Sequence, residues 1–217
     1  MGRLTGKVVM ITGTSRGLGL GLAEAFRAEG AEVERASRRE GIDVTQEEDV
    51  ITWFDRAQEI HGRIDVLVNN AGVLTPRKPL AEVAIEEWEE SIAGNLTSVF
   101  LCCREAVRRM IPQESGLIIN VSSGVADRAA PLWGAYAAAK WGALGLTKLL
   151  AEEVGGEGIR VVAVNPSRTR TTMRAEAYPD EDPLTVKTPE KTAPFFLALA
   201  AGEIPFENGE HLEWREV

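Results

Sequence analysis

The stretch Thr12-Gly13-Thr14-Ser15-Arg16-Gly17-Leu18-Gly19 decides the fold class of this chain. It follows a short apolar run at residues 7–12 and leads into residues 18–26, where apolar side chains recur with helical periodicity up to Gly30. This order predicts a strand, a tight turn and a helix. Glycines permit such a turn and let backbone N–H groups approach a pyrophosphate at the helix N-terminus. The stretch therefore predicts a dinucleotide-binding turn; the alternative is a strand-to-helix turn that binds nothing.

The rest of the chain alternates between apolar, β-branched runs and helical patterns. We expect further strands at residues 32–36, briefly near Ile42, and at 66–69, 117–121, 160–164 and 210–214. We expect helices at 46–61, from 86 to about 110, at 135–154 and at 188–201. Apolar strands separated by helices indicate a parallel sheet covered on both faces, with right-handed crossovers. The sequence predicts one α/β domain over residues 1–217, a doubly wound Rossmann-type sandwich of about seven strands.

Composition narrows the class of partner. The 217 residues carry a net charge of -9, which argues against nucleic acid or an anionic membrane surface, because phosphate binding requires clustered Lys and Arg. Cys102 and Cys103 are adjacent in a predicted helix and would diverge around it, so we expect a reducing, cytoplasmic location rather than a disulfide. His61 and His211 lack neighbours at metal-ligand spacing, so no metal site is expected.

Two arginines bear on the identity of the dinucleotide. NAD is held by an acidic residue near the end of the second strand, but Ser37 and Arg38 stand there. Arg38 and Arg16 could meet a ribose 2'-phosphate with paired hydrogen bonds, although either could be a solvated surface charge. The sequence favours NADP, and Asp43 is placed to reach the adenine edge.

Five motifs, in order, resemble the short-chain dehydrogenase/reductase family, including its 3-oxoacyl reductases, from about Lys7 to Met173. They are the glycines Gly13, Gly17 and Gly19; Asp43-Val44; Asn69-Asn70-Ala71-Gly72; Asn95; and Ser123 followed by Tyr136-x-x-x-Lys140. The resemblance implies that Asn69 ties the sheet to neighbouring loops and that Thr171 holds the nicotinamide carboxamide. The complete set of expected cofactor contacts is Gly13, Ser15, Arg16, Gly17, Leu18, Gly19, Ser37, Arg38, Asp43, Val44, Asn70, Ala71, Gly72, Tyr136, Lys140, Pro166, Thr169 and Thr171.

Tyr136 and Lys140 lie one helical turn apart, so their side chains share a helix face. An ammonium there can lower the pKa of the phenol by favouring phenolate. By resemblance, Tyr136 is the general acid and base, and Asn95 holds a water that connects Lys140 to solvent. Ser123 would bond the substrate oxygen, and we choose it over Ser122 because of its interval before the tyrosine.

The sequence says less about the residues that surround the substrate. We expect a short lid around residues 168–187, where Arg168, Arg170 and Arg174 could bind an anionic substrate or be solvated charges. Trp133 could border the pocket or pack in the core. Ser167 stands where the family usually has glycine, and residues 39–42 are too few for the usual helix, so that edge of the sheet should be abbreviated.

The leading hypothesis is an oxidoreductase that moves a hydride between NADP(H) and a carbonyl or secondary alcohol. A non-catalytic dinucleotide sensor or scaffold is the alternative, and a nucleotide-sugar epimerase or dehydratase ranks last because the chain after Met173 is short. Among small molecules, 3-oxoacyl, steroid-like, sugar and simple ketone substrates all remain open, as does the reaction direction. By resemblance, helices 86–110 and 135–154 would pair subunits into a homodimer or homotetramer.

Overall fold

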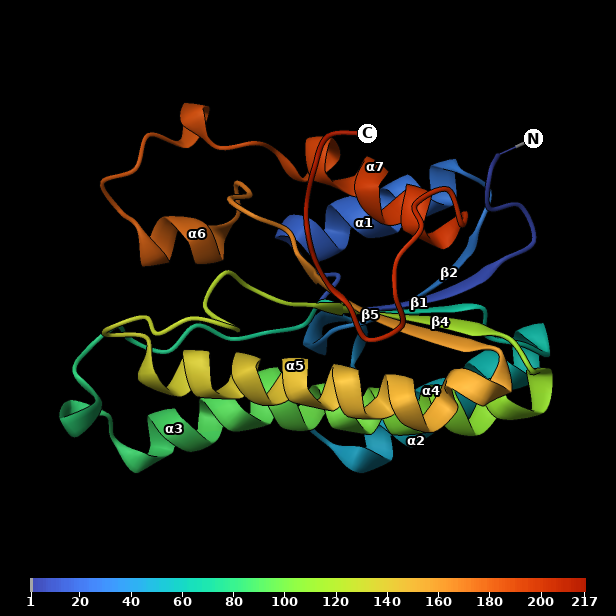
Figure 1. Ribbon diagram of the computed structural model, residues 1–217, viewed down its shortest axis with the longest axis horizontal. Helices are drawn as coiled ribbons and strands as arrows, with labels where there is room; N and C mark the ends of the chain where they lie inside the picture. The colour runs from blue at the N-terminus through green and yellow to red at the C-terminus, as the bar shows by residue number, and fades with distance from the viewer. Residues whose placement is uncertain (1) are drawn as a thin grey trace.

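The computed structural model describes residues 2–217 as three layers, with a sheet between two layers of helices (Figure 1). The strands are β1 (Val8–Thr12), β2 (Glu32–Ala36), β3 (Val66–Asn69), β4 (Gly116–Val121), β5 (Ile159–Asn165) and β6 (His211–Glu213). The helices are α1 (Gly17–Ala28), α2 (Glu47–His61), α3 (Ile85–Ile92), α4 (Ser98–Met110), α5 (Gly134–Val154), α6 (Thr172–Ala177) and α7 (Pro189–Ala200). The predicted single-domain α/β sandwich is confirmed in class and in the order of its elements.

All strand pairs are parallel, and the order across the sheet is β2-β1-β3-β4-β5-β6. The chain therefore moves outward from β1 in one direction to β2 and in the other direction to β3. The crevice beyond the carboxyl ends of the strands at such a reversal is where doubly wound sheets bind ligands. Thr12, at the end of β1, is the residue from which the glycine turn starts.

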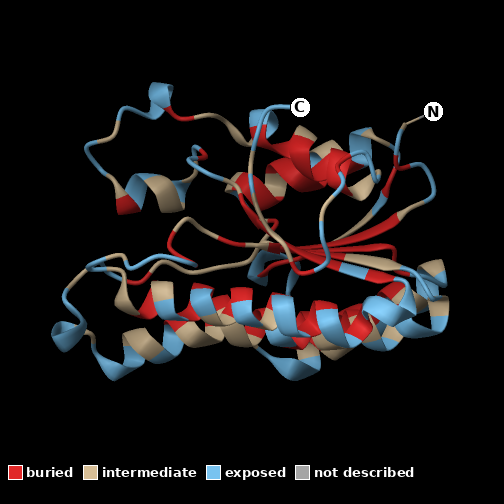
Figure 2. Ribbon diagram, in the orientation of Figure 1, coloured by how far each residue is buried: buried red, intermediate tan, exposed pale blue. Residues whose placement is uncertain are grey.

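Helices cover the two faces of the sheet unequally (Figure 1). α1 and α7 lie together on one face, around buried residues that include Phe26 and Phe196. α2, α4 and α5 cover the other face, where Phe54 and Met110 belong to the core. Buried residues concentrate on the strands and the inner helix faces (Figure 2), which fixes the strand ends that carry the site.

The sheet has six strands. The prediction of a seventh, a brief strand near Ile42, is therefore wrong. After β2 the chain forms a 3-10 turn, and Gly41 adopts φ +78°. The amide of Ile42 then bonds back to the carbonyl of Ser37 at 3.0 Å, which directs the chain away from the edge of β2 and into α2. Too few residues remain for a strand to run alongside β2, and the expected abbreviation of this edge is confirmed.

The long helix expected from residue 86 to 110 is interrupted. A π-helical segment, Ala93–Thr97, joins α3 to α4 and contains Asn95. Single π turns inside α-helices are frequent at functional sites because they re-aim the side chains around them. Within residues 2–217, no helix is long and apolar enough to cross a membrane.

Candidate active site

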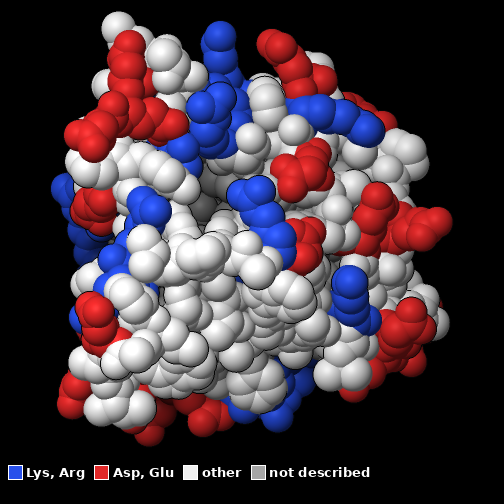
Figure 3. All heavy atoms as spheres, turned by 60° about the vertical axis from the view of Figure 1, so that its left-hand side comes forward, with Lys and Arg blue, Asp and Glu red and all other residues white. Residues whose placement is uncertain are grey.

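A cavity of about 460 Å³ opens at the carboxyl ends of the strands. It is bordered by the glycine turn, the end of β2, the loops after β3, β4 and β5, and the start of α5. Figure 3 shows a hollow on the side of the molecule that carries α6, with Lys and Arg side chains on its rim. The volume falls within the usual range for small-molecule sites.

The glycine turn is packed too closely for side chains. Gly13 has φ +72°, and a Cβ there would lie 2.8 Å from the Cα of Ala71. At Gly19 a Cβ would lie 2.2 Å from the carbonyl oxygen of Gly13. Asn70 donates through Nδ2 to the carbonyl of Thr12 at 3.0 Å, which fixes the turn against the loop after β3. The result is a backbone-lined cradle at the N-terminus of α1, suited to a pyrophosphate.

Cationic side chains lie at the end of the cavity beside β2. Arg16, Arg38 and Arg39 all line it, and the Arg38 side chain is 74% exposed. Arg38 donates through Nε to Asp43 at 2.8 Å. Burial opposes ionisation of Asp43, but hydrogen bonds from Thr45 and Arg38 outweigh it and lower the pKa of this carboxyl. The carboxylate nearest the expected adenosine site is thus already paired with an arginine.

The structure brings the residues expected from the sequence together. Every one of the expected cofactor contacts lines the cavity, and so does Ser123. Asn69, at the end of β3, donates through Nδ2 to Asn120 of β4 at 2.8 Å, so it joins two strands rather than the sheet to a neighbouring loop as expected. Among residues 2–217 there is no group of three or more His, Cys, Asp or Glu residues that could hold a metal ion.

Tyr136 and Lys140 project from α5 into the cavity and are 8% and 4% exposed. The ammonium of Lys140 donates to the carbonyl of Val121 at 2.8 Å and lies 5.8 Å from the centre of the Tyr136 ring. Burial lowers the pKa of Lys140 to about 8. The hydrogen bond to the carbonyl at the end of β4 therefore fixes the orientation of the Lys140 side chain beside Tyr136.

The expected lowering of the Tyr136 pKa is wrong. Burial raises the pKa of Tyr136 to about 12, against a hydrogen bond with Ser123 that lowers it. Loss of hydration disfavours phenolate, and Lys140 is directed to Val121 rather than to the phenol oxygen. At neutral pH Tyr136 is therefore a neutral phenol, the form that can donate a proton.

Asn95 lies behind the cavity wall. Its side chain is fully buried and bonds both backbone groups of Val73, accepting from N–H at 3.1 Å and donating to C=O at 3.0 Å. Its Nδ2 also donates to the carbonyl of Ser91. Asn95 does not line the cavity, so its direct contribution is to hold the loop after β3 in place.

The loop after β5 borders the other end of the cavity. Pro166, Thr169 and Thr171 line it, and the hydroxyl of Thr171 accepts from the amide of Arg174 to cap α6. A hydroxyl that accepts one bond still has its proton to donate, so Thr171 is free to donate to a carboxamide oxygen. Ser167 adopts φ +56°, a conformation that favours glycine, in agreement with its place in the sequence pattern.

The three arginines at the mouth of the cavity already have partners within the chain. Arg174 makes two hydrogen bonds of 2.7 Å to Glu181, Arg170 donates to the carbonyl of Val186, and Arg168 lies 3.6 Å from Glu181. Arg174 alone of the three lines the cavity. Trp133 borders it, which settles the choice between pocket and core packing in favour of the pocket.

Two residues that shape the site were missed by sequence reasoning. Arg77 and Lys187 act on loops that meet only in the folded chain: Arg77 stacks on Trp133 and Tyr178, and Lys187 bonds carbonyls of the loop after β5. No local pattern marks such contacts, because each depends on segments far apart in sequence.

Comparison with known proteins shows the family to which the chain belongs. The family model for short chain dehydrogenases matches residues 40–182. The chain is 34% identical to the 3-oxoacyl-(acyl-carrier-protein) reductase of Chlamydia muridarum, over 96% of each protein. It is 33% identical to the D-threitol dehydrogenase of Mycolicibacterium smegmatis, over 81% of this chain and 75% of the relative.

Solved structures agree in fold. The chain superimposes on a short chain dehydrogenase from Shigella flexneri, complexed with NADP, with a TM-score of 0.90. The two are 26% identical, and the match covers 97% of both chains. Levodione reductase superimposes with a TM-score of 0.88 at 27% identity, over 97% of this chain and 96% of that one.

Proposed function

Because this chain belongs to the short-chain dehydrogenase family, we propose that it is an NADP(H)-dependent carbonyl reductase and secondary-alcohol dehydrogenase, with Tyr136 as the proton donor and acceptor. One observation carries the proposal. Tyr136, Ser123 and Lys140 lie in a single cavity with the glycine turn, so a proton donor and a dinucleotide cradle face the same space. Hydride transfer requires this juxtaposition of cofactor and acid.

The cavity fits the dinucleotide. The pyrophosphate would lie at the glycine turn, where Gly13 and Gly19 leave no room for a Cβ. The adenosine ribose would lie beside Arg16 and Arg38, and the cationic pair there supports NADP over NAD. Thr171 and Pro166 would hold the nicotinamide ring against Tyr136.

The proton transfer follows from the protonation state that burial gives to Tyr136. A bound reduced nicotinamide would supply the hydride that reaches the carbonyl carbon. Tyr136, a neutral phenol, gives its proton to the carbonyl oxygen, and Ser123 stabilises the charge that develops on that oxygen. The alcohol leaves, and the phenolate must regain a proton from solvent. In the alcohol-oxidising direction each of these transfers runs in reverse.

Lys140 is placed to support reprotonation. It is aimed by the carbonyl of Val121 and is buried, which lowers its pKa to about 8. Such an ammonium can give up a proton near neutral pH, whereas an exposed lysine would hold it. Asn95 holds the loop after β3 through Val73, and its proposed role is to hold a water that connects Lys140 to solvent.

The test is turnover with and without the phenol. Tyr136→Phe should lower kcat by about 100-fold or more for any ketone that the wild-type enzyme reduces, which is the range for a lost general acid. NADPH affinity, measured by fluorescence titration, should change little because the ring is retained. If the variant kept most of its turnover, the assigned donor would be wrong. If NADPH bound but no carbonyl was reduced by the wild type, a cofactor-sensing role would replace the enzymatic one.

A further inference from the structure

Three aromatic rings form a row that begins at the candidate catalytic residue. Trp133, at the N-cap of α5, lies with its ring centre 5.6 Å from that of Tyr136. Tyr178, at the C-cap of α6, lies 6.0 Å beyond Trp133. All three line the cavity. A substrate with its carbonyl at Tyr136 would therefore rest its body against Trp133 and Tyr178.

Arginines hold this row in place. The guanidinium of Arg77 lies 5.0 Å from the ring centres of both Trp133 and Tyr178, and it donates to the carbonyl of Ala177. Arg174 stacks on Tyr178 at 3.7 Å. Such contacts join the loop after β3, the start of α5 and the end of α6. The aromatic wall is thus fixed by three segments at once.

The guanidinium of Arg77 stacks on the rings and donates to the carbonyl of Ala177, but Arg77 does not line the cavity. The guanidinium that does line this end is already paired. Among the described residues 2–217, Arg174 is the charged residue that lines this end beyond Lys140, and Glu181 neutralises it with two hydrogen bonds of 2.7 Å. The lining also includes the apolar residues Leu74, Met173 and Ala177. A carboxylate or phosphate placed here would lose hydration without gaining a free counter-charge.

Resting on the proposed function, we propose that the substrate is an uncharged ketone or secondary alcohol with a flat, apolar ring system that lies along Trp133 and Tyr178. Burial of apolar surface favours the binding of such a body. Ring faces also pack better against a fixed aromatic wall than a flexible chain does, because a rigid body loses less conformational entropy on binding. Glu181 is the specificity-determining residue that excludes anions, since it pairs with Arg174, the guanidinium that lines this end of the cavity.

The experiment uses three ten-carbon ketones with NADPH: 2-decalone, which is cyclic and uncharged; 2-decanone, which is linear and uncharged; and 9-oxodecanoate, which is linear and carboxylated. We expect kcat/KM to fall about tenfold from the first to the second and about tenfold again to the third. Trp133→Ala should remove most of the preference for 2-decalone, while Trp133→Phe should retain it. A preference for 9-oxodecanoate over 2-decanone would overturn the inference.

A second experiment substitutes Glu181 and looks for an increase in activity. Glu181→Gln frees the Arg174 charge, so kcat/KM for 9-oxodecanoate should rise about fivefold or more, with 2-decalone much less affected. No rise would overturn the role of Glu181. If the wild-type enzyme reduced none of the ketones, the proposed function would fail. Calorimetric binding of the three ketones to the enzyme–NADPH complex would still decide the ligand class. Tighter binding of 9-oxodecanoate than of 2-decalone would overturn the inferred preference for an uncharged ring system.

Discussion

The ammonium of Lys187 donates a hydrogen bond of 2.7 Å to the carbonyl oxygen of Pro166, a residue that lines the cavity at the expected nicotinamide end. The same ammonium donates to the carbonyl of Arg168 at 3.0 Å and lies 4.1 Å from the centre of the Trp214 ring. Lys187 therefore clamps the loop on both sides of Ser167, whose backbone holds the unfavourable φ of +56°. The C-terminal tail reaches the active site through this lysine.

Removing the clamp should impair catalysis more than folding. In Lys187→Met, we expect kcat to fall by about tenfold, because a displacement of about 1 Å at the reacting groups is enough for such losses. Lys187→Arg should recover part of the activity by bonding the same carbonyls. Steady-state kinetics and the thermal midpoint are the measurements. Lys191→Met, at an exposed lysine of α7, is the control and should behave as wild type. Equal loss of activity and stability in Lys187→Met would indicate a merely structural role.

The ionisation of Tyr136 can be read directly, since the chain has two tyrosines, Tyr136 and Tyr178. In the cofactor-free Tyr178→Phe variant, ultraviolet absorbance of tyrosinate should not develop until pH exceeds about 11, because burial raises the pKa of Tyr136 to about 12. The phenol then remains protonated, and able to donate, throughout the neutral range. A midpoint at or below about 10 would contradict the effect assigned to burial.

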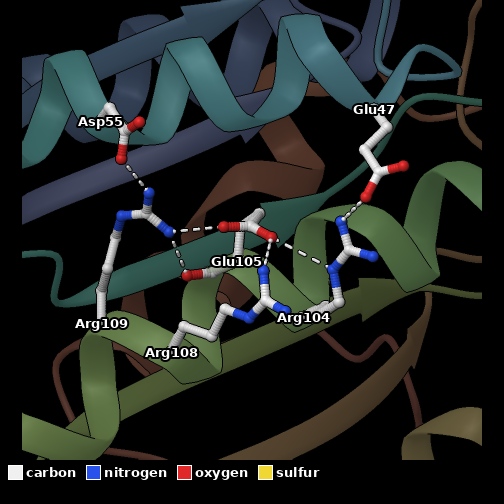
Figure 4. A network of polar contacts seen from close by, with 6 residues as sticks. All are labelled: Glu47, Asp55, Arg104, Glu105, Arg108 and Arg109. Atoms are coloured by element: carbon white, nitrogen blue, oxygen red, sulfur yellow. Dashed lines mark hydrogen bonds and ion pairs between the residues drawn. The ribbon is translucent and has the colours of Figure 1, made fainter.

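Glu105 should make a large contribution to stability. Its side chain is 3% exposed and accepts from Arg104, Arg108 and Arg109, as Figure 4 shows. Burial opposes its ionisation, but hydrogen bonds from Arg109 and Arg104 outweigh it and lower the pKa of the carboxyl. Because the pKa is lower in the folded state, the stabilisation is present above the unfolded pKa of about 4.5 and is lost as pH falls through the folded value.

Replacing this carboxylate leaves three arginines without their shared partner. Glu105→Gln should lower the free energy of unfolding at neutral pH by about 3 kcal/mol, and the difference from wild type should shrink below about pH 4. Urea unfolding at both pH values measures it. Glu90→Gln, at an exposed glutamate of α3, should change little at either pH. A pH-independent difference would mean that charge is not the cause.

The coenzyme preference should depend on the two arginines beside the adenosine end. Arg16→Ala and Arg38→Ala should each lower the ratio of kcat/KM for NADPH over NADH by about tenfold, because each removes a charge-assisted bond to the 2'-phosphate. Arg56→Ala, on the exposed side of α2, tests for a general effect of charge. Unchanged ratios in both variants would remove the basis for NADP.

The elements of this fold follow from local pattern, but the shape of its active site does not. The glycine turn and the Tyr136–Lys140 spacing are encoded within a few residues, so their places were predictable from the sequence. The missing strand near Ile42 depended on a backbone bond from Ile42 to Ser37, which no apolar pattern records. The pKa of Tyr136 was misjudged because spacing reveals a neighbouring charge but not burial or where Lys140 points.

A second copy of the chain is the expected partner of the α4–α5 layer. Trp141 and Leu149 are 50% and 56% exposed on α5, and Gly145 lies between them at helical spacing. Within the described chain, nothing lies within 4 Å of where a Cβ of Gly145 would be, so a partner helix could approach closely there. We propose that wild-type protein forms a homodimer or homotetramer through this face. Light scattering should show Gly145→Glu at a lower mass than wild type, while Ile60→Glu, at an exposed position on α2, should keep the wild-type mass. A monomeric wild type would exclude the assembly.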